Sequence, residues 1–273
     1  MKNKFFVFFL FAFTCLSLLL DWNFVHRSNF FKLGSLIKNE EKSNFILGSS
    51  SALTGIDTKM LGSSWRNYSM DNTTLIYQRC LLNYLLENNV DIDTLILCID
   101  EFARRESNLT VNSYRYLPLL NYTHVFDSLF VLNQLRFNRF LPLYKYVSFN
   151  SELLYPGVFS LIRPNFRYRY DSLGDFIYPY GDNFIKDFDH LESISFSEPL
   201  ELSRIKKICS KEGIKLFVVI LPRKDFRVLN VSPDILDFSQ RVNRNDLFYD
   251  DKHLNYSGRQ YITPILKREL QKK

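Results

Sequence analysis

The chain begins with a long apolar run and continues as short apolar stretches separated by amphipathic ones. Two lysines precede an uncharged run over 5–20, which Asp21 closes. This run is apolar on every helical face, which is typical of a membrane segment rather than of a core helix. Basic residues on its first flank predict a cytoplasmic N-terminus and an exported remainder. No small-x-small cleavage site follows, so we expect an uncleaved signal anchor over 1–25, rather than a cleaved signal peptide, with a juxtamembrane linker over 26–43.

Beyond the linker, strand-like and helix-like units alternate. Short, mainly apolar runs predict buried strands at 44–47, 94–99 and 215–221. Helical spacing of apolar positions predicts helices at 75–86 and 200–209. Apolar strands separated by helices indicate a parallel sheet that is covered on both faces. We therefore predict an α/β domain over 44–273 with three layers, in which a parallel sheet carries helices on both faces.

A basic and aromatic segment interrupts this alternation. Residues 103–170 hold nine Lys/Arg against three Asp/Glu, an excess equal to the net charge of +6 of the whole chain. A helical pattern runs over 125–140. We interpret about 103–195 as a helical, aromatic insertion or lid over the sheet, not as a separate domain. Such a charge asymmetry indicates either an anionic partner or a solvated face.

Composition narrows the class of protein. The 273 residues are 46% hydrophobic and 16% aromatic, which excludes an intrinsically disordered chain. Four cysteines in this length exclude a disulfide-dense module. Cys80 and Cys98 lie in apolar runs, so we expect buried thiols rather than a disulfide pair. No Cys-x-x-Cys or histidine-rich spacing points to zinc, and we expect neither a metal nor another cofactor.

A glycine-serine turn, Gly48-Ser49-Ser50-Ser51, follows the first exported strand. In open parallel sheets, ligands bind beyond the carboxyl ends of the strands, where this turn is expected. A hydroxyl held there can receive the field of a helix N-terminus and neighbouring backbone N–H groups. A serine cluster after a strand is also an ordinary helix cap. Taken alone, the turn leaves both interpretations open.

The sequence Asp250-Asp251-Lys252-His253-Leu254-Asn255 lies in a polar stretch that leads into a final predicted helix. An acid three residues before a histidine can fix the imidazole tautomer and stabilise its cation. The other ring nitrogen is then able to take a proton from a hydroxyl. The remaining histidines lie in settings where solvation is expected; they are His26, His124 and His190.

Together, the two stretches resemble the SGNH/GDSL hydrolases, whose nucleophilic serine follows the first strand and whose Asp-x-x-His lies near the C-terminus. The first block is Ile46 to Ser51 and the last is Asp250 to Asn255, followed by Gly258. The resemblance implies that Ser50 is the nucleophile, His253 the general base and Asp250 its orienting acid. It leaves Ser49 and Ser51 as weaker nucleophile candidates and Asp251 as the weaker acid.

The middle blocks of the family are altered in this chain. The stretch 69–73 lacks the glycine whose backbone N–H the second block supplies, and Asp100 stands where the third block has its oxyanion-binding Asn. An ionised carboxylate there would repel a developing oxyanion. The oxyanion candidates are Ser50, Asn72 and Asp100. Either Asn72 or a backbone N–H replaces the missing donor, or Asp100 points elsewhere, or activity is feeble or absent.

The anchor, together with the strand over 214–221 and its following Pro222, is similar to a membrane-anchored branch of this family. That branch accompanies D-alanylation of teichoic acid and O-acetylation of exported polysaccharides. The similarity implies a single-pass membrane protein with an extracytoplasmic serine O-acyltransferase or esterase domain acting on exported cell-surface polysaccharide. It also implies a possible membrane-bound acyl donor protein as partner. The alternative is a catalytically silent scaffold that binds glycan or a membrane acyltransferase.

Four residues of the basic segment are candidates for substrate binding: Arg163, Arg167, Tyr168 and Arg169. Guanidinium groups could pair with an anionic polymer while aromatic faces stack on sugar rings. Alternatively, the tyrosines pack on the sheet and the arginines are solvated. Nucleic acid uses the same residue types, but an exported domain rarely meets it, so no nucleic acid partner is expected. An intracellular DNA-binding protein, which the pI of about 9.0 would fit, requires the anchor to be wrong.

Overall fold

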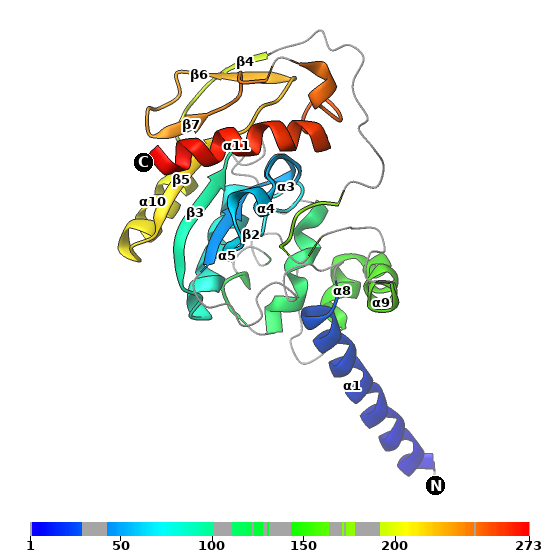
Figure 1. The fold of residues 1–273 in the computed structure, drawn as a ribbon. Coiled ribbons are helices and arrows are strands. Elements are labelled where there is room, and N and C mark those ends of the chain that lie inside the picture. Colours follow the sequence, from blue (N-terminus) through cyan, green and yellow to red (C-terminus); the bar gives the residue numbers. More distant parts are fainter. Residues whose placement is uncertain are drawn as a thin grey trace. The chain divides into compact units, whose positions relative to one another are not determined.

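The structure, a computed structural model, comprises two compact units. It describes residues 2–28, 43–100, 111–121, 123–127, 130, 143–163, 171, 173–177, 192–242 and 244–272. We call the first unit the helical unit; it contains Met1–Lys38 and Ser113–Arg169. The second is the α/β unit, with Asn39–Asn112 and Tyr170–Lys273 (Figure 1). The segment 113–169 thus groups with the N-terminal helix, whereas the sequence led us to place it within the α/β domain.

A five-stranded parallel sheet forms the centre of the α/β unit. Its strands, in the spatial order β2-β1-β3-β5-β7, are Trp65–Asn67, Ser43–Leu47, Ile92–Cys98, Lys215–Ile220 and Ile235–Asp237. Every neighbouring pair is parallel. The predicted parallel sheet is therefore confirmed. A separate two-stranded parallel sheet pairs β4 (Glu192–Ser195) with β6 (Phe226–Leu229).

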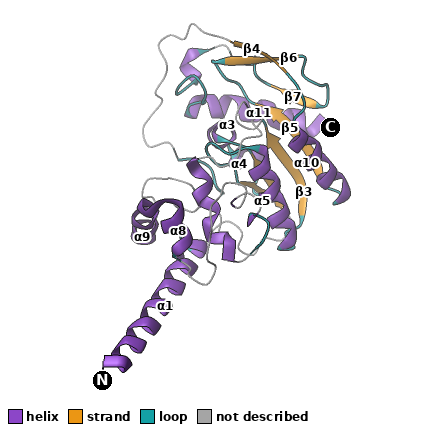
Figure 2. Ribbon diagram, turned by 180° about the vertical axis from the view of Figure 1, so that it is seen from behind, coloured by secondary structure: helices purple, strands orange, loops and turns teal. Residues whose placement is uncertain are grey.

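Helices cover both faces of the five-stranded sheet. One face carries α5 (Leu75–Glu87) and α10 (Leu200–Lys211), which contact each other and stand in front of β3 in Figure 2. The other carries α3 (Ser50–Gly55), α4 (Thr58–Leu61) and α11 (Tyr256–Lys272), which stand in front in Figure 1. The predicted α/β class, with helices flanking a parallel sheet, is confirmed.

The core between these layers is apolar, and it is closely packed beside the glycine-serine turn. The strand residues Ile46, Ile96 and Val219 are fully buried. A Cβ atom on Gly48 would lie only 2.5 Å from Ala52 Cβ and 2.9 Å from the Cβ of Cys98. Because contacts that short are excluded, only glycine lets the turn after β1 pack directly on β3.

The three cysteines of the α/β unit are buried and unpaired, as predicted for Cys80 and Cys98. Burial raises the pKa of Cys80 to about 11. Burial likewise raises the pKa of Cys209 to about 12. These thiols are therefore protonated at neutral pH and have the low reactivity of structural cysteines.

The helical unit contains α1 (Lys2–His26), α8 (Tyr144–Asn150) and α9 (Leu154–Ile162). Two 3₁₀ helices accompany them, η1 (Val111–Asn121) and η2 (Ser151–Leu153). The helix α1 is long and apolar enough over Lys4–His26 to cross a membrane. Most of the helix predicted over 125–140, and most of the linker over 26–43, lie outside the described residues.

Candidate active site

The candidate site lies at the carboxyl edge of the five-stranded sheet. Ser50 begins α3 directly after β1, and Asn72 follows β2. Asp250 and His253 follow β7 in the loop before α11. The chain runs from β1 to β2 on one side and then to β3 on the other side. This reversal is the switch point at which open parallel sheets bind their ligands.

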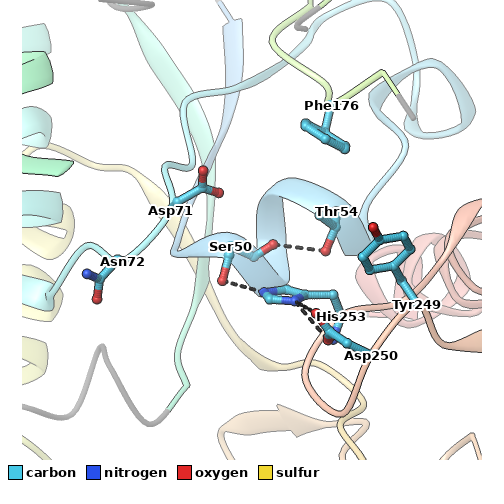
Figure 3. A pocket seen from close by; sticks show the side chains of 8 residues that line it. All are labelled: Ser50, Thr54, Asp71, Asn72, Phe176, Tyr249, Asp250 and His253. Atoms are coloured by element: carbon cyan, nitrogen blue, oxygen red, sulfur yellow. Dashed lines mark hydrogen bonds and ion pairs between the residues drawn. The ribbon is translucent and has the colours of Figure 1, made fainter. Parts of the chain in front are cut away.

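Ser50, His253 and Asp250 are joined by hydrogen bonds (Figure 3). Ser50 Oγ lies 2.7 Å from His253 Nε2. On the other side of the ring, His253 Nδ1 lies 2.9 Å from Oδ1 and 2.8 Å from Oδ2 of Asp250. With Asp250 ionised, Nδ1 carries the ring hydrogen and donates it, so Nε2 accepts the hydrogen of the Ser50 hydroxyl. The geometry is that of a serine nucleophile with its base and orienting acid.

A tight turn holds Asp250 against His253. Asp250 Oδ1 accepts the backbone N–H groups of Lys252 and His253, each at 2.8 Å. The Tyr249 N–H donates to the His253 carbonyl at 2.8 Å and closes the loop. Burial alone would raise the pKa of Asp250, but the hydrogen bond and charge of His253, with both backbone N–H groups, outweigh it and leave the pKa below its usual value. Asp250 is therefore ionised at neutral pH.

The base of this loop is fixed by residues after the Asp-x-x-His block. Buried Asn255 accepts the Gly258 N–H through Oδ1 at 2.9 Å and donates through Nδ2 to the Asp246 carbonyl at 2.8 Å. A Cβ atom on Gly258 would lie 2.1 Å from the Leu247 carbonyl oxygen, so glycine is required there. Asp251, the weaker candidate acid, accepts the Lys224 N–H at 2.9 Å through its backbone carbonyl.

A cavity of about 320 Å³ opens onto Ser50 and His253. Its lining residues are Ser50, Thr54, Asp71, Asn72, Phe176, Tyr249, Asp250 and His253. Figure 3 shows Phe176 and Tyr249 on the Thr54 side, with Asp71 and Asn72 on the other. The volume is at the lower end of the range for small-molecule sites. Sequence reasoning missed Thr54, Asp71, Phe176 and Tyr249 as lining residues.

Phe176 is held in the wall of this cavity by its neighbours. The buried carboxylate of Asp175 accepts the Thr58 N–H at 2.9 Å, the Thr58 hydroxyl at 2.6 Å and the amide of Asn67 at 3.2 Å. Arg259 donates to the Phe176 carbonyl at 2.9 Å. Burial raises the pKa of Asp175, although the hydrogen bonds from Thr58 oppose this. The segment that carries Phe176 is therefore anchored to α4, β2 and α11.

Asp100 is directed towards the serines that flank the nucleophile. Its Oδ2 accepts the Ser51 hydroxyl at 3.0 Å and also the Ser49 hydroxyl. Asp100 is buried and is not among the residues that line the cavity. Of the possibilities weighed from the sequence, the structure shows Asp100 pointing elsewhere, where it holds the turn after β1. Its candidacy for the oxyanion position has no geometric support.

Asn72 lines the cavity, with its side chain apart from the hydrogen bond between Ser50 and His253 (Figure 3). Its φ of 53° lies in the left-handed region that glycine adopts most readily. The backbone thus has a glycine-like conformation in the stretch where the resemblance called for a glycine. Whether Ser50 or Asn72 binds an oxyanion stays a prediction.

The predicted substrate-binding residues belong to another part of the chain. Arg163 is exposed at the end of α9 in the helical unit. Arg167, Tyr168 and Arg169 lie outside the described residues. Polymer binding by these four side chains stays a prediction. Within the described residues, no group of three or more His, Cys, Asp or Glu side chains could hold a metal ion.

The chain was also compared with known proteins. No protein-family model matches it, and no curated protein matches it either.

Proposed function

We propose that this chain is a membrane-anchored serine acyl-ester enzyme, an O-acyltransferase or esterase that acts on exported cell-surface polysaccharide. The observation that carries the proposal is the pair of contacts joining Ser50, His253 and Asp250 at the mouth of one cavity. The sheet order and the nucleophile after β1 are compatible with an SGNH hydrolase fold, as the sequence motifs imply. The length and apolar character of α1 support a single-pass anchor.

In the acylation step, the Ser50 oxygen attacks the carbonyl carbon of an acyl ester while its proton passes to His253 Nε2. The new bond joins Ser50 Oγ to the carbonyl carbon, and the ionised Asp250 stabilises the imidazolium through Nδ1. When the tetrahedral intermediate collapses, the bond to the leaving alcohol breaks. His253 returns the proton to that alcohol. The product is an ester of Ser50.

In the second step, a hydroxyl group takes the place of the departed alcohol. His253 Nε2 removes its proton, its oxygen attacks the acyl carbon, and the bond to Ser50 Oγ breaks as Ser50 regains the proton. A sugar hydroxyl as acceptor gives transfer, and water gives hydrolysis. A membrane-bound acyl donor protein would be the source of the acyl group in the transferase reaction.

Two backbone N–H groups are the proposed oxyanion donors. Ser50 opens α3, where the first N–H groups of a helix have no intrahelical acceptor. Asn72 lines the same cavity in a glycine-like backbone conformation. With Asp100 engaged by Ser49 and Ser51, this pair would replace the donor set of the family's middle blocks.

The test is covalent labelling with a fluorophosphonate, which reacts with an activated serine. We expect labelling of Ser50, located by mass spectrometry of the modified peptide. Ser50→Ala and His253→Ala should each lower ester turnover by at least about 10³-fold. Ser63→Ala, which removes an exposed hydroxyl elsewhere in the α/β unit, is the matched control. Undiminished turnover in either folded site variant contradicts the proposal.

The silent scaffold remains the second candidate because of one observation. Asp100, a buried carboxylate, occupies the place of the family's oxyanion-binding Asn. If the folded wild-type chain in lipid nanodiscs takes up no fluorophosphonate but retains a cell-surface glycan, the scaffold function is supported and the enzyme is rejected.

A further inference from the structure

The helical unit has an apolar core of its own, with Phe24, Leu117 and Phe126 fully buried, but its helices also expose large apolar side chains. In α9, the buried residues are Pro156, Gly157 and Ser160. On the outside, Tyr155 is 55% exposed and Ile162 is 73% exposed. A helix on the surface of a protein in water has the opposite arrangement, with its bulky apolar residues inside. Small residues inside and bulky apolar residues outside are typical of helices that pack within lipid.

The helix α8 also exposes apolar side chains beside a buried charge. Its Lys145 and Tyr146 are almost completely buried, whereas Tyr144 and Val147 are each 45% exposed. Lysine is almost never fully buried unless it is paired, so the inner face of α8 has to provide a partner for Lys145.

The last part of α1 shows the same pattern. Ser17 and Asp21 are buried, while Leu18 and Leu19 are more than half exposed. Since α1 is a candidate membrane span, its exposed leucines have lipid as their natural surroundings. Each of the three helices therefore exposes apolar side chains next to a buried small or polar one.

Polar and aromatic contacts fasten α8 and α9 to the end of α1. Lys145 Nζ lies 2.8 Å from Asp21 Oδ1, and the Tyr146 hydroxyl donates to the same oxygen at 2.6 Å. Phe24 meets the Tyr146 ring edge-on, with centroids 5.2 Å apart. In Figures 1 and 2, both helices lie beside the C-terminal end of α1.

The length of α1 gives the depth of these contacts. A hydrocarbon core of about 30 Å takes about 20 helical residues. A span that begins at Lys4 therefore leaves the hydrocarbon near Phe24. Asp21 and Phe24, which α8 touches, then lie at the outer boundary of the hydrocarbon. The side chain of Tyr146 on α8, which contacts both residues, therefore lies at the same depth.

We propose that α8 and α9 form a second membrane element, seated in the outer interface of the bilayer with Tyr144, Val147, Tyr155 and Ile162 facing lipid. The partner of this surface is the lipid bilayer itself. The inference rests on the proposed crossing by α1. It also explains the ion pair, because a carboxylate at that depth must be paired within the protein. Lys145 and the Tyr146 hydroxyl supply the partners of Asp21.

The experiment measures depth in the full chain, reconstituted as one copy per lipid nanodisc. Tyr155→Cys and Ile162→Cys are each made together with Cys15→Ser and labelled with an environment-sensitive fluorophore. The lipids carry a quencher on the acyl chain, either close to the headgroup (the shallow lipid) or close to the terminal methyl group (the deep lipid). We expect a blue-shifted emission at both positions and stronger quenching by the shallow lipid. Lys207→Cys, on an exposed position of α10, is the aqueous control and should not be quenched.

The native Cys15 separates the two proposals, because it is exposed on α1. In the otherwise unaltered chain, its label should be quenched more by the deep lipid. If that holds but positions 155 and 162 behave like Lys207→Cys, α8 and α9 do not enter the bilayer and the inference is overturned. If the Cys15 label is not quenched, the crossing by α1 itself fails. Because a single copy per disc excludes a second chain, quenching at 155 and 162 identifies lipid as the neighbour.

Discussion

The helices α10 and α9, one from each unit, place their apolar residues differently. In the α/β unit, α10 turns Leu202 and Ile205 into the core and leaves Lys207 exposed. In the helical unit, α9 turns Ser160 inward and leaves Ile162 exposed. Burying apolar surface is favourable in water but gains little where the surroundings are lipid. The proposed contact of α9 with lipid would account for this difference.

The units also differ in how they satisfy buried polar groups. The α/β unit surrounds Asp175 and Asn255 with backbone and uncharged side-chain partners close to the cavity. The helical unit joins Asp21 to Lys145 in an ion pair whose members are both almost fully buried. Hydrogen bonds to neutral groups fix positions near the site, whereas the ion pair joins α1 to α8.

The largest effect is expected from breaking that ion pair. Lys145→Met removes the cation that is paired with the buried Asp21 carboxylate. Removing one member of a buried pair costs about 3–5 kcal/mol. We expect amide hydrogen exchange in α8 and α9 to accelerate accordingly, while fluorophosphonate labelling of Ser50 in the other unit is retained.

The control for this prediction is the double variant Asp21→Leu with Lys145→Met. Replacing both charges with apolar side chains is close to neutral for many buried pairs, so protection of α8 and α9 should return. Equal exchange in the single and double variants would show that the ion pair does not join these helices.

A smaller effect is expected at the wall of the cavity. Phe176→Ala enlarges the space beside Ser50 and should shift the preference between long and short acyl esters by about tenfold towards the longer ones. Competition between fluorophosphonates with short and long alkyl groups measures this shift at Ser50. Tyr261→Ala removes an exposed aromatic ring that does not line the cavity and should leave the ratio unchanged. An unchanged ratio in Phe176→Ala removes this residue from the determinants of specificity.

The smallest effect concerns the pH dependence of stability. Because the pKa of Asp250 is lowered in the folded chain, its stabilising contribution is present above the ordinary aspartate pKa of about 3.9 and is lost as the pH falls through the lowered value. Asp250→Asn should therefore be less stable than wild type at neutral pH, by a fraction of a kcal/mol since the side chain is 39% exposed. Urea midpoints from Trp65 fluorescence, at neutral and at strongly acid pH, check this. A difference that persists unchanged in acid contradicts it.

Much of the α/β unit could be predicted from the apolar runs. The strands β1, β3 and β5, together with α5 and α10, lie where the pattern placed them. The strands β2 and β7 were missed because each has only three residues, and a three-residue strand has too short a pattern to stand out. The helices α8 and α9 were missed as well. Apolar periodicity alone does not tell a lipid-facing surface from a core-facing one.

The candidate site was predictable only in part. Two motifs identified Ser50, Asp250 and His253, and the structure brings these side chains together. Phe176 carries no motif, because its place depends on how Asp175 and Arg259 hold a returning segment. The direction of Asp100 was equally hidden, since the serines that bind it were considered as nucleophiles or as a helix cap, not as partners of Asp100.

One separation along the chain has a consequence for biosynthesis. The hydroxyl of Ser50 and the imidazole of His253 are 203 residues apart. At ribosomal rates, the serine is made about 10–40 s before the histidine. During that interval the nascent polypeptide has its alcohol but no base to activate it, so a prematurely terminated product would be chemically inert. The proposed acyl-ester chemistry could begin only when the loop that carries His253 has joined the sheet.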